Sequence, residues 1–365
     1  MSLAKVAKLA GVSSSTVSRV INNHPRVAPN TERTVRTAMA ELAYVPSERR
    51  PGPKSQSRLK SETKNIALLV FGASTGQSTP AFSGLLRGVS MGATENNLNL
   101  SFNYVPNPDQ LPSRIIDQGI DGVLLHGARP GVDAERRLRT IPAVWLMGNR
   151  RRPEWGDQVL PDSYEIGHLA AQYLLRAGQT QLAFMNLDAD SWPFRQYCLA
   201  FTAAAAERDL KIVAIEQTRH ASTDYWQSYN TSEVEAIVAR FMALSPRPTG
   251  IFVADDIQVA VIQPMLLHAG LKLGPGHTQI ISCNNEKPYL MGLTPRPAVV
   301  DIRVESIGRR GVEQLIWRMS HPHVNDRIIS GIEPVLIEQD NPQYSSSTFD
   351  ISRKSTPIAT ALLPA

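Results

Sequence analysis

Residues 4–22 read AKVAKLAGVSSSTVSRVIN, and this stretch decides how the N-terminal part of the chain folds. Apolar residues recur at helical spacing before Gly11 and again after it, which predicts two short amphipathic helices. Gly11 suits the tight turn between them because glycine tolerates a positive φ. Ser13 stands where a residue would cap the second helix. The stretch therefore predicts a helix-turn-helix.

The solvent face of the predicted second helix carries hydrogen-bonding groups, one guanidinium and no carboxylate. Its residues are Ser14, Ser15, Ser18, Arg19 and Asn22. Such a face suits the major groove of DNA, where side chains meet phosphates and base edges. The alternative is a small helical hairpin that binds nothing.

Basic residues are concentrated beside this hairpin. Residues 1–64 hold 12 Lys and Arg residues against 4 Glu residues and no Asp, a net charge of +8, whereas the whole chain has a net charge of +5. The rest of the chain is therefore slightly acidic. A block of positive charge beside a compact helical head indicates a partner with a phosphate backbone.

A third helix is predicted to begin at Pro29, with Ala28 as its N-cap, and to close a three-helix head. It should end near Tyr44, because Pro46 disfavours helical geometry in the residue before it. Residues 47–64 are polar and interrupted by proline and glycine, so we assign them to a linker.

From residue 65 onward, apolar strands without polar alternation are separated by helices. This pattern predicts parallel sheets covered on both faces, and the strand count suits two Rossmann-like subdomains better than one sheet. Ligands bind such sheets at the carboxyl ends of the strands. The predicted strands are 65–71, 98–105, 122–125, 143–147, 182–186, 211–217, 250–254 and 279–283, and the predicted helices are 80–97, 108–118, 132–139, 166–177, 194–209, 232–244 and 257–269.

Several classes of function lack support in the sequence. No apolar run approaches the roughly 20 residues that a membrane span needs, and the first residues do not resemble a signal peptide. Cys198 and Cys283 make no disulfide framework, which favours a reducing cytoplasm. Dinucleotide and phosphate loops, a nucleophile elbow and a metal-ligand cluster are missing, so we expect no cofactor, no metal and no enzyme.

Three further features allow local predictions. Glycines 84, 88 and 92 share one face of the helix 80–97, where we expect close packing against the sheet. Asp255 and Asp256 follow a predicted strand and should point to opposite sides, which makes them poor partners in catalysis. One of them is placed to cap the next helix, and the other to face a cleft.

Three motifs, VAKLAGVS at residues 6–13, TVSRVIN at 16–22 and AELAYVP at 40–46, are similar to those of the lactose-repressor (LacI/GalR) family of transcription regulators. The resemblance continues more weakly to about residue 340. It implies a DNA-binding head and a periplasmic-binding-protein-like core of two subdomains. The implied boundaries are 1–46 for the head, 47–64 for the hinge, 65–342 for the core and 343–365 for a flexible tail. Within the core they are 65–162 and 295–321 for the N-subdomain, and 163–294 and 322–342 for the C-subdomain.

The resemblance also implies roles in DNA binding. Ser13 and Thr16 match positions that contact phosphates, Ser14 and Ser15 match the two variable positions that read bases, Arg19 matches a base-reading arginine, and Ser18 and Asn22 match further contact positions. The family has a short hinge helix after the head, but prolines leave no room for one between residues 47 and 54. Our hypothesis is that this segment runs extended and lays Arg49 and Arg50 in an A·T-rich minor groove. The alternative is a solvated linker.

The implied effector site differs from the family pattern. Phe82, Asp255 and Asp256 match pocket positions, whereas Asn284 and Met147 stand where an aspartate is common, and Tyr197 stands where most members have an arginine. Arg195 lies close enough in sequence to substitute for that arginine. Trp192, Phe194 and Trp226 offer either stacking faces or packing. A small polar effector, sugar-like, suits this composition.

We therefore expect a cytoplasmic, homodimeric transcriptional regulator, a repressor, that binds a near-palindromic DNA operator under the control of a small-molecule effector. The C-terminal residues 345–365 show no heptads, which favours a dimer over a coiled-coil tetramer. The alternatives are a solute-binding protein with the same core fold, a regulator whose cleft is unused, and an enzyme.

Overall fold

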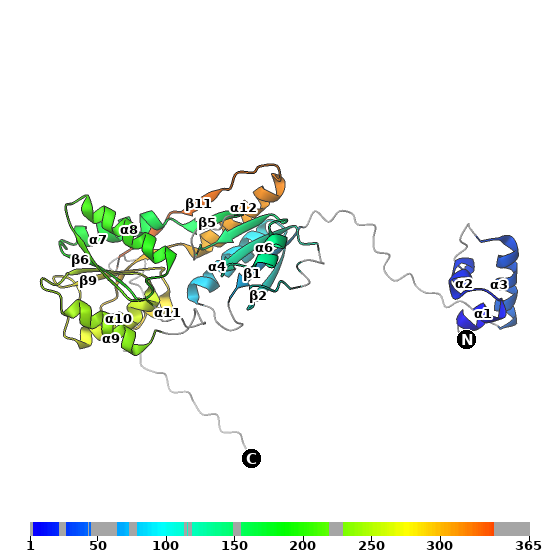
Figure 1. Cartoon of the computed structure of the whole chain (residues 1–365), viewed down its shortest axis with the longest axis horizontal. Coiled ribbons are helices and arrows are strands. Elements are labelled where there is room, and N and C mark those ends of the chain that lie inside the picture. The colour runs from blue at the N-terminus through cyan, green and yellow to red at the C-terminus, as the bar shows by residue number, and fades with distance from the viewer. Residues whose placement is uncertain are drawn as a thin grey trace, which may run out of the picture. The chain divides into compact units, whose positions relative to one another are not determined.

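The computed structural model describes residues 3–21, 27–42, 44, 64–72, 79–112, 115, 119–148, 155–218 and 229–338. The chain divides into two compact units, Met1–Glu62 and Thr63–Ala365. Figure 1 shows both units.

The first unit is a three-helix head made of α1 (Leu3–Leu9), α2 (Ser14–Ile21) and α3 (Pro29–Glu41). Gly11 takes a φ of +63° in the turn between α1 and α2, as predicted. The N–H of Thr16 donates to the Ser13 Oγ at 3.2 Å, which confirms Ser13 as the cap of α2. Ala28 is the N-cap of α3. The apolar faces of the three helices close one small core, which contains Val6, Ala7, Ala10, Val17, Val20, Val35 and Ala38.

In its described residues, the second unit contains two six-stranded sheets, each with its own helices, which we call the first lobe and the second lobe (Figure 1). The sheet of the first lobe has the order β11-β5-β4-β3-β1-β2. Its elements are β1 (Asn65–Phe71), α4 (Pro80–Glu95), β2 (Asn99–Val105), β3 (Gly122–Gly127), α6 (Val132–Leu138), β4 (Ala143–Leu146), β5 (Asp157–Pro161), α12 (Val304–Ser320) and β11 (Ile329–Ile332). Apolar side chains of α4 and α12 pack on one face of this sheet, and Leu138 of α6 packs on the other.

The sheet of the second lobe has the order β12-β10-β9-β8-β6-β7. Helices α7 and α8 cover one face, and α9 and α10 cover the other (Figure 1). The elements are α7 (Ser163–Arg176), β6 (Leu182–Asn186), α8 (Trp192–Ala206), β7 (Ile212–Glu216), α9 (Thr231–Met242), β8 (Gly250–Val253), α10 (Asp256–His268), β9 (Gln279–Cys283), α11 (Lys287–Leu290), β10 (Ala298–Asp301) and β12 (Val335–Ile337).

The predicted architecture of two parallel sheets is confirmed, with one exception at an edge. Among the strands that the structure describes, every pair is parallel except β10 and β12, which are antiparallel. The chain passes between the lobes at different points from those expected. We expected residues 295–321 to belong to the N-subdomain and 322–342 to the C-subdomain. Residues 298–301 belong to the second lobe and 329–332 to the first, because the apolar run of β10 extends the sheet at β9 while β11 extends the other sheet at β5.

The predicted helix 108–118 is wrong at its start. Residues 108–112 are not helical. The N–H of Asp109 donates to the Asn107 Oδ1 at 3.0 Å, which forms a turn among Pro106, Pro108 and Pro112. Ile115 is helical, whereas residues 113, 114 and 116–118 lie outside the described residues.

The glycines of α4 pack against a helix and not against the sheet. A Cβ atom at Gly88 would lie 2.1 Å from the carbonyl oxygen of Glu305, and one at Gly92 would lie 3.1 Å from the Cβ of Val312. Both contacts are on α12. A Cβ atom at Gly308 of α12 would meet the carbonyl oxygen of Leu85 at 2.4 Å in return. Small residues on both helices thus allow their backbones to approach closely.

Candidate functional site

The solvent face of α2 has the composition that the sequence predicts. Ser13, Ser14, Ser15 and Arg19 are exposed, and Thr16 and Ser18 are half-buried. Val17 and Val20 point the other way, into the core of the head. The other predicted DNA contacts, Asn22, Arg49 and Arg50, lie outside the described residues.

Hydrogen bonds tie the hydroxyls at the start of α2 together. The Ser13 Oγ lies 2.7 Å from the Ser15 Oγ and 2.9 Å from the Thr16 Oγ1, and it also accepts the N–H of Thr16. On α3, the carboxylate of Glu32 is paired with Arg36 at 2.7 Å. The face of α2 therefore offers hydroxyls and one guanidinium to a partner.

Most of the predicted effector residues follow the carboxyl ends of strands in the two lobes. Met147 follows β4, Asp255 and Asp256 follow β8, and Asn284 follows β9. Met147 packs against the cores of both lobes, so it lies where the lobes meet.

Phe82 lies in the first turn of α4 and is 4% exposed. Its ring stacks on the imidazole of His126 with centroids 5.5 Å apart, and Phe102 and Tyr104 lie beside it. The Nδ1 of His126 lies 3.2 Å from the carbonyl oxygen of Leu146. Burial lowers the pKa of His126, against this hydrogen bond, so the imidazole is neutral at pH 7. Nothing in the sequence distinguished His126 from the other histidines.

Asp255 and Asp256 have different environments. Asp255 is the N-cap of α10, and its Oδ1 accepts the N–H of Gln258 at 2.9 Å, which confirms that one of the pair caps this helix. Asp256 does not face a cleft, because it is fully buried. Its carboxylate accepts hydrogen bonds from the hydroxyl of Ser282 and from the N–H of Glu286. Burial raises the pKa of Asp256 to about 7, and burial also raises the pKa of Asp255.

The residues at the start of α8 do not assemble around a ligand position. Tyr197 is 3% exposed and packs in the core of the second lobe with Phe194. Arg195 is exposed, and its guanidinium donates to the carbonyl oxygen of Ala189 and to Asp190 at 2.6 and 3.0 Å. Trp192 is half-buried in the first turn of α8. Trp226 lies outside the described residues.

Glu286 is a residue that sequence reasoning missed at this place. It follows β9, is 5% exposed, and its Oε1 accepts the N–H of Ala81 from the first lobe at 2.9 Å. Its Oε2 lies 3.4 Å from the Nδ2 of Asn284. The contact joins residues that are 205 positions apart, so no local pattern in the sequence could predict it.

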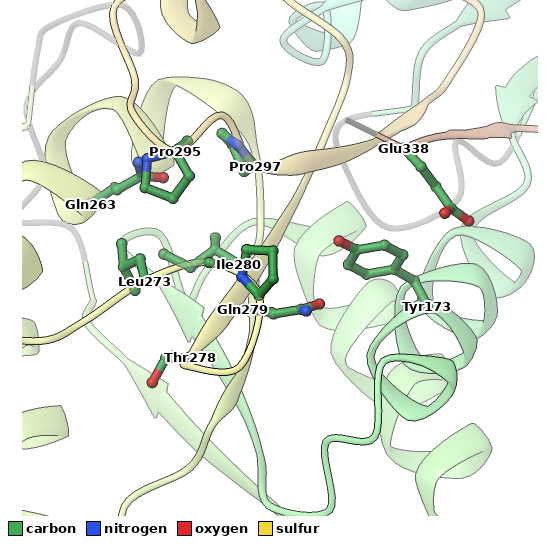
Figure 2. A pocket seen from close by; sticks show the side chains of 11 residues that line it. Tyr173, Gln263, Leu273, Thr278, Gln279, Ile280, Pro295, Pro297 and Glu338 are labelled. Atoms are coloured by element: carbon green, nitrogen blue, oxygen red, sulfur yellow. The ribbon is translucent and has the colours of Figure 1, made fainter. Parts of the chain in front are cut away.

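A small hollow of about 100 Å³ lies at the opposite ends of the strands, before β9 and β10. Figure 2 shows the side chain of Gln279 directed toward the ring of Tyr173 there, beside Glu338. The Nε2 of Gln263 donates to the carbonyl oxygen of Pro295 at 2.7 Å and closes one wall. None of the predicted effector residues lines this hollow.

Among the residues that the structure describes, no group of three or more His, Cys, Asp and Glu side chains is placed to hold a metal ion. In the same part of the chain, no helix has the length and apolar character to cross a membrane.

Comparisons with known proteins agree with this arrangement. Residues 2–47 match the bacterial regulatory proteins of the lacI family, and residues 171–340 match a periplasmic binding protein-like domain. The HTH-type transcriptional repressor PurR of Mannheimia succiniciproducens is 25% identical, over 91% of this chain and 96% of that protein. The ribose operon repressor of Escherichia coli is 24% identical, over 92% of this chain and 97% of that protein.

Solved structures share the fold over most of the chain. The lac repressor dimer bound to operator and an anti-inducer is 16% identical, covers 93% of this chain and 98% of its own, and has a TM-score of 0.59. A complex of the transcriptional regulator CelR with cellobiose is 20% identical with the same coverage and a TM-score of 0.59. With its helix-turn-helix head and two-lobed core, the chain belongs to the lacI family of bacterial regulatory proteins, which bind DNA to control transcription.

Proposed function

We propose that this regulator is a homodimeric repressor whose α2 helices read the two half-sites of a near-palindromic operator. The observation that carries this proposal is the two-sided character of α2. Serines and Arg19 are exposed on one face, and Val17 and Val20 are buried on the other. Among the described residues, Arg19 makes no ion pair, so its guanidinium is available for guanine, the base that arginine contacts most often. Ser13 and Thr16 would contact phosphates.

The experiment first selects a duplex from a random pool with the full-length chain, and then compares variants on it. Arg19→Ala should weaken binding by ~1–3 kcal/mol and relax the preference at one base pair in each half-site. Arg36→Ala is the matched control, because that guanidinium is paired with Glu32 on α3. If Arg19→Ala bound every base variant as the parent does, this assignment would fail.

The proposed effector is a small polar molecule, sugar-like, that binds between the lobes at the carboxyl ends of the strands. Support comes from the positions of Asn284, Asp255 and Met147 beside that edge, and from aromatic rings around Phe82. Relatives of the same fold are solved with cellobiose and with ribose. Aromatic faces and hydrogen-bonding side chains together suit rings rich in hydroxyls.

Arg195, Tyr197 and Asp256 receive less support, because each is engaged by other parts of the second lobe. A thermal-shift screen of pentoses, hexoses, disaccharides and nucleobases on the full-length chain tests the effector proposal. A hit should be weakened by Asn284→Ala and left unchanged by Asn96→Ala, which alters an amide at the end of α4. A screen in which no ligand shifts the melting temperature would favour an unused cleft.

The dimer and the compartment follow as further parts of the proposal. A symmetric operator needs two heads, and a relative of the same fold is described as a dimer on its operator. Light scattering of the full-length chain should give twice the mass of 40.1 kDa. Because the chain acts on DNA, we propose that it is cytoplasmic, in the compartment that holds its operator.

A further inference from the structure

One hydrogen bond between the lobes joins a backbone donor of the first to a side chain of the second. The N–H of Ala81 in α4 donates to the Oε1 of Glu286 at 2.9 Å. Glu286 is 5% exposed, so its carboxylate is withdrawn from water at this contact. A charged acceptor that has lost its water needs partners in the protein.

The start of α4 explains why the N–H of Ala81 is open to an outside acceptor. The first amides of a helix have no acceptor within it. Pro80 carries no N–H, the N–H of Phe82 donates to the Thr79 Oγ1 at 3.1 Å, and that of Ser83 donates to the Thr79 carbonyl at 3.0 Å. Ala81 is the donor of this turn that remains, and the helix dipole favours a negative charge beside it.

The loop after β9 holds Glu286 in position for this contact. Asn284 and Asn285 take φ values of +104° and +62°, which turn the chain sharply, and the Nδ2 of Asn285 donates to Asp301 at 3.0 Å. The N–H of Glu286 donates to the buried Asp256 at 2.6 Å. The second lobe therefore orients the carboxylate before it meets α4.

We propose that Glu286 is an internal closing group, which holds the two lobes together in the absence of any effector by supplying the missing acceptor of Ala81. Asp256 then acts as a positioning residue, because it fixes the backbone of Glu286. The proposal concerns the closed state of the core alone and does not depend on which effector, if any, the cleft binds. A hydrogen bond to a charged group of this kind should change the population of open molecules by about tenfold or more.

Amide exchange at Ala81 tests the contact directly in the full-length chain. Glu286→Ala should speed exchange at Ala81 about tenfold or more, and Glu286→Gln should have a smaller effect because its carbonyl oxygen still accepts. The N–H of Ser83 is the internal reference, since its acceptor lies within α4. Glu313→Ala is the matched control, because that carboxylate lies on the surface of α12 and pairs with Arg310.

A distance between the lobes tests whether the contact closes them. Spin labels on Arg137→Cys in α6 and Glu235→Cys in α9, with Cys198→Ser to remove the half-buried thiol, report that distance without effector. We expect a longer and broader distance distribution in Glu286→Ala than in the parent and in Glu313→Ala. If Ala81 exchanges as in the parent, or if its exchange rises while the distance stays the same, the proposal is overturned. Glu286→Gln carries both measurements if Glu286→Ala does not fold.

Discussion

The guanidinium of Arg318 on α12 forms a bidentate ion pair with the carboxylate of Asp157 at the start of β5, and its Nε and Nη2 donate to the two carboxylate oxygens at 2.9 and 2.5 Å. Asp157 is 1% exposed and also accepts from Gln314 and from the N–H of Ile328. Arg318 donates in addition to the carbonyl oxygens of Val324 and Asp326. This ion pair thus connects α12, β5 and the segment between α12 and β11 in one hydrogen-bond network.

Arg318→Met should therefore destabilise the core strongly. It leaves a buried carboxylate without its counter-charge, which costs about 3–5 kcal/mol in the free energy of unfolding. Arg136→Met is the control, because its pair with Asp133 on α6 is mostly exposed and such pairs contribute about 0–1 kcal/mol. Urea unfolding of the full-length chain measures both. Equal losses in the two variants would contradict the special role of the Arg318 pair.

The close approach of α4 and α12 predicts a steric effect at Gly88. The Cβ atom of Gly88→Ala would lie 2.1 Å from the carbonyl oxygen and 2.8 Å from the carbonyl carbon of Glu305, and neither backbone atom can move without shifting α12. We expect the free energy of unfolding to fall by about 2 kcal/mol or more. Gly292→Ala, where the added atom meets nothing within 4 Å, should stay within about 0.5 kcal/mol of the parent. Thermal unfolding separates the two results.

The apolar runs made parts of the fold predictable. The strands β1, β6 and β9 begin and end where the sequence predicts, because each is a buried run between breaks. The strand β5 was missed because it opens with Asp157 and Gln158, whose burial depends on partners such as Arg318 that lie far along the chain. The edge strands β11 and β12 were also missed, because they have only four and three residues and none of these residues is fully buried.

The candidate sites divide in the same way. The face of α2 could be predicted because a helix of eight residues places its polar and apolar sides by spacing alone. The effector side could not, because Tyr197 turns into the core and Glu286 reaches the other lobe, and both outcomes depend on tertiary packing. The glycines of α4 signalled close packing correctly, but only the fold shows that the partner is α12.

The buried Asp256 predicts a pH dependence of stability. Its pKa is about 7 in the folded chain against an ordinary value of 3.8, so the folded state binds the proton more tightly. Proton binding by Asp256 therefore adds its full contribution to the free energy of unfolding below about pH 4, and this contribution is lost as the pH rises through about 7. The free energy of unfolding falls by at most about 1.4 kcal/mol for each pH unit in this range.

Asp256→Asn should flatten that fall, because the amide does not titrate while its carbonyl oxygen still accepts the N–H of Glu286. Urea unfolding at several pH values between 4 and 8 measures the slope. Asp133→Asn, at an exposed position on α6, should keep the slope of the parent. A parent-like slope in Asp256→Asn would show that the proton is held elsewhere.

The hydroxyl network at the start of α2 predicts unequal roles for the two serines at the reading positions. The Ser15 Oγ lies 2.7 Å from the Ser13 Oγ, so this hydrogen bond already uses part of the capacity of the Ser15 hydroxyl, whereas Ser14 has no side-chain hydrogen bond among the described residues. Ser14→Ala should therefore lose about 1 kcal/mol, or about fivefold, of discrimination at one base pair, and Ser15→Ala should lose less. Thr34→Ala, which removes a hydroxyl from α3, is the control. Affinities for all single-base variants of the selected duplex measure the difference, and a larger relaxation in Ser15→Ala than in Ser14→Ala would show that DNA reorganises this network on binding.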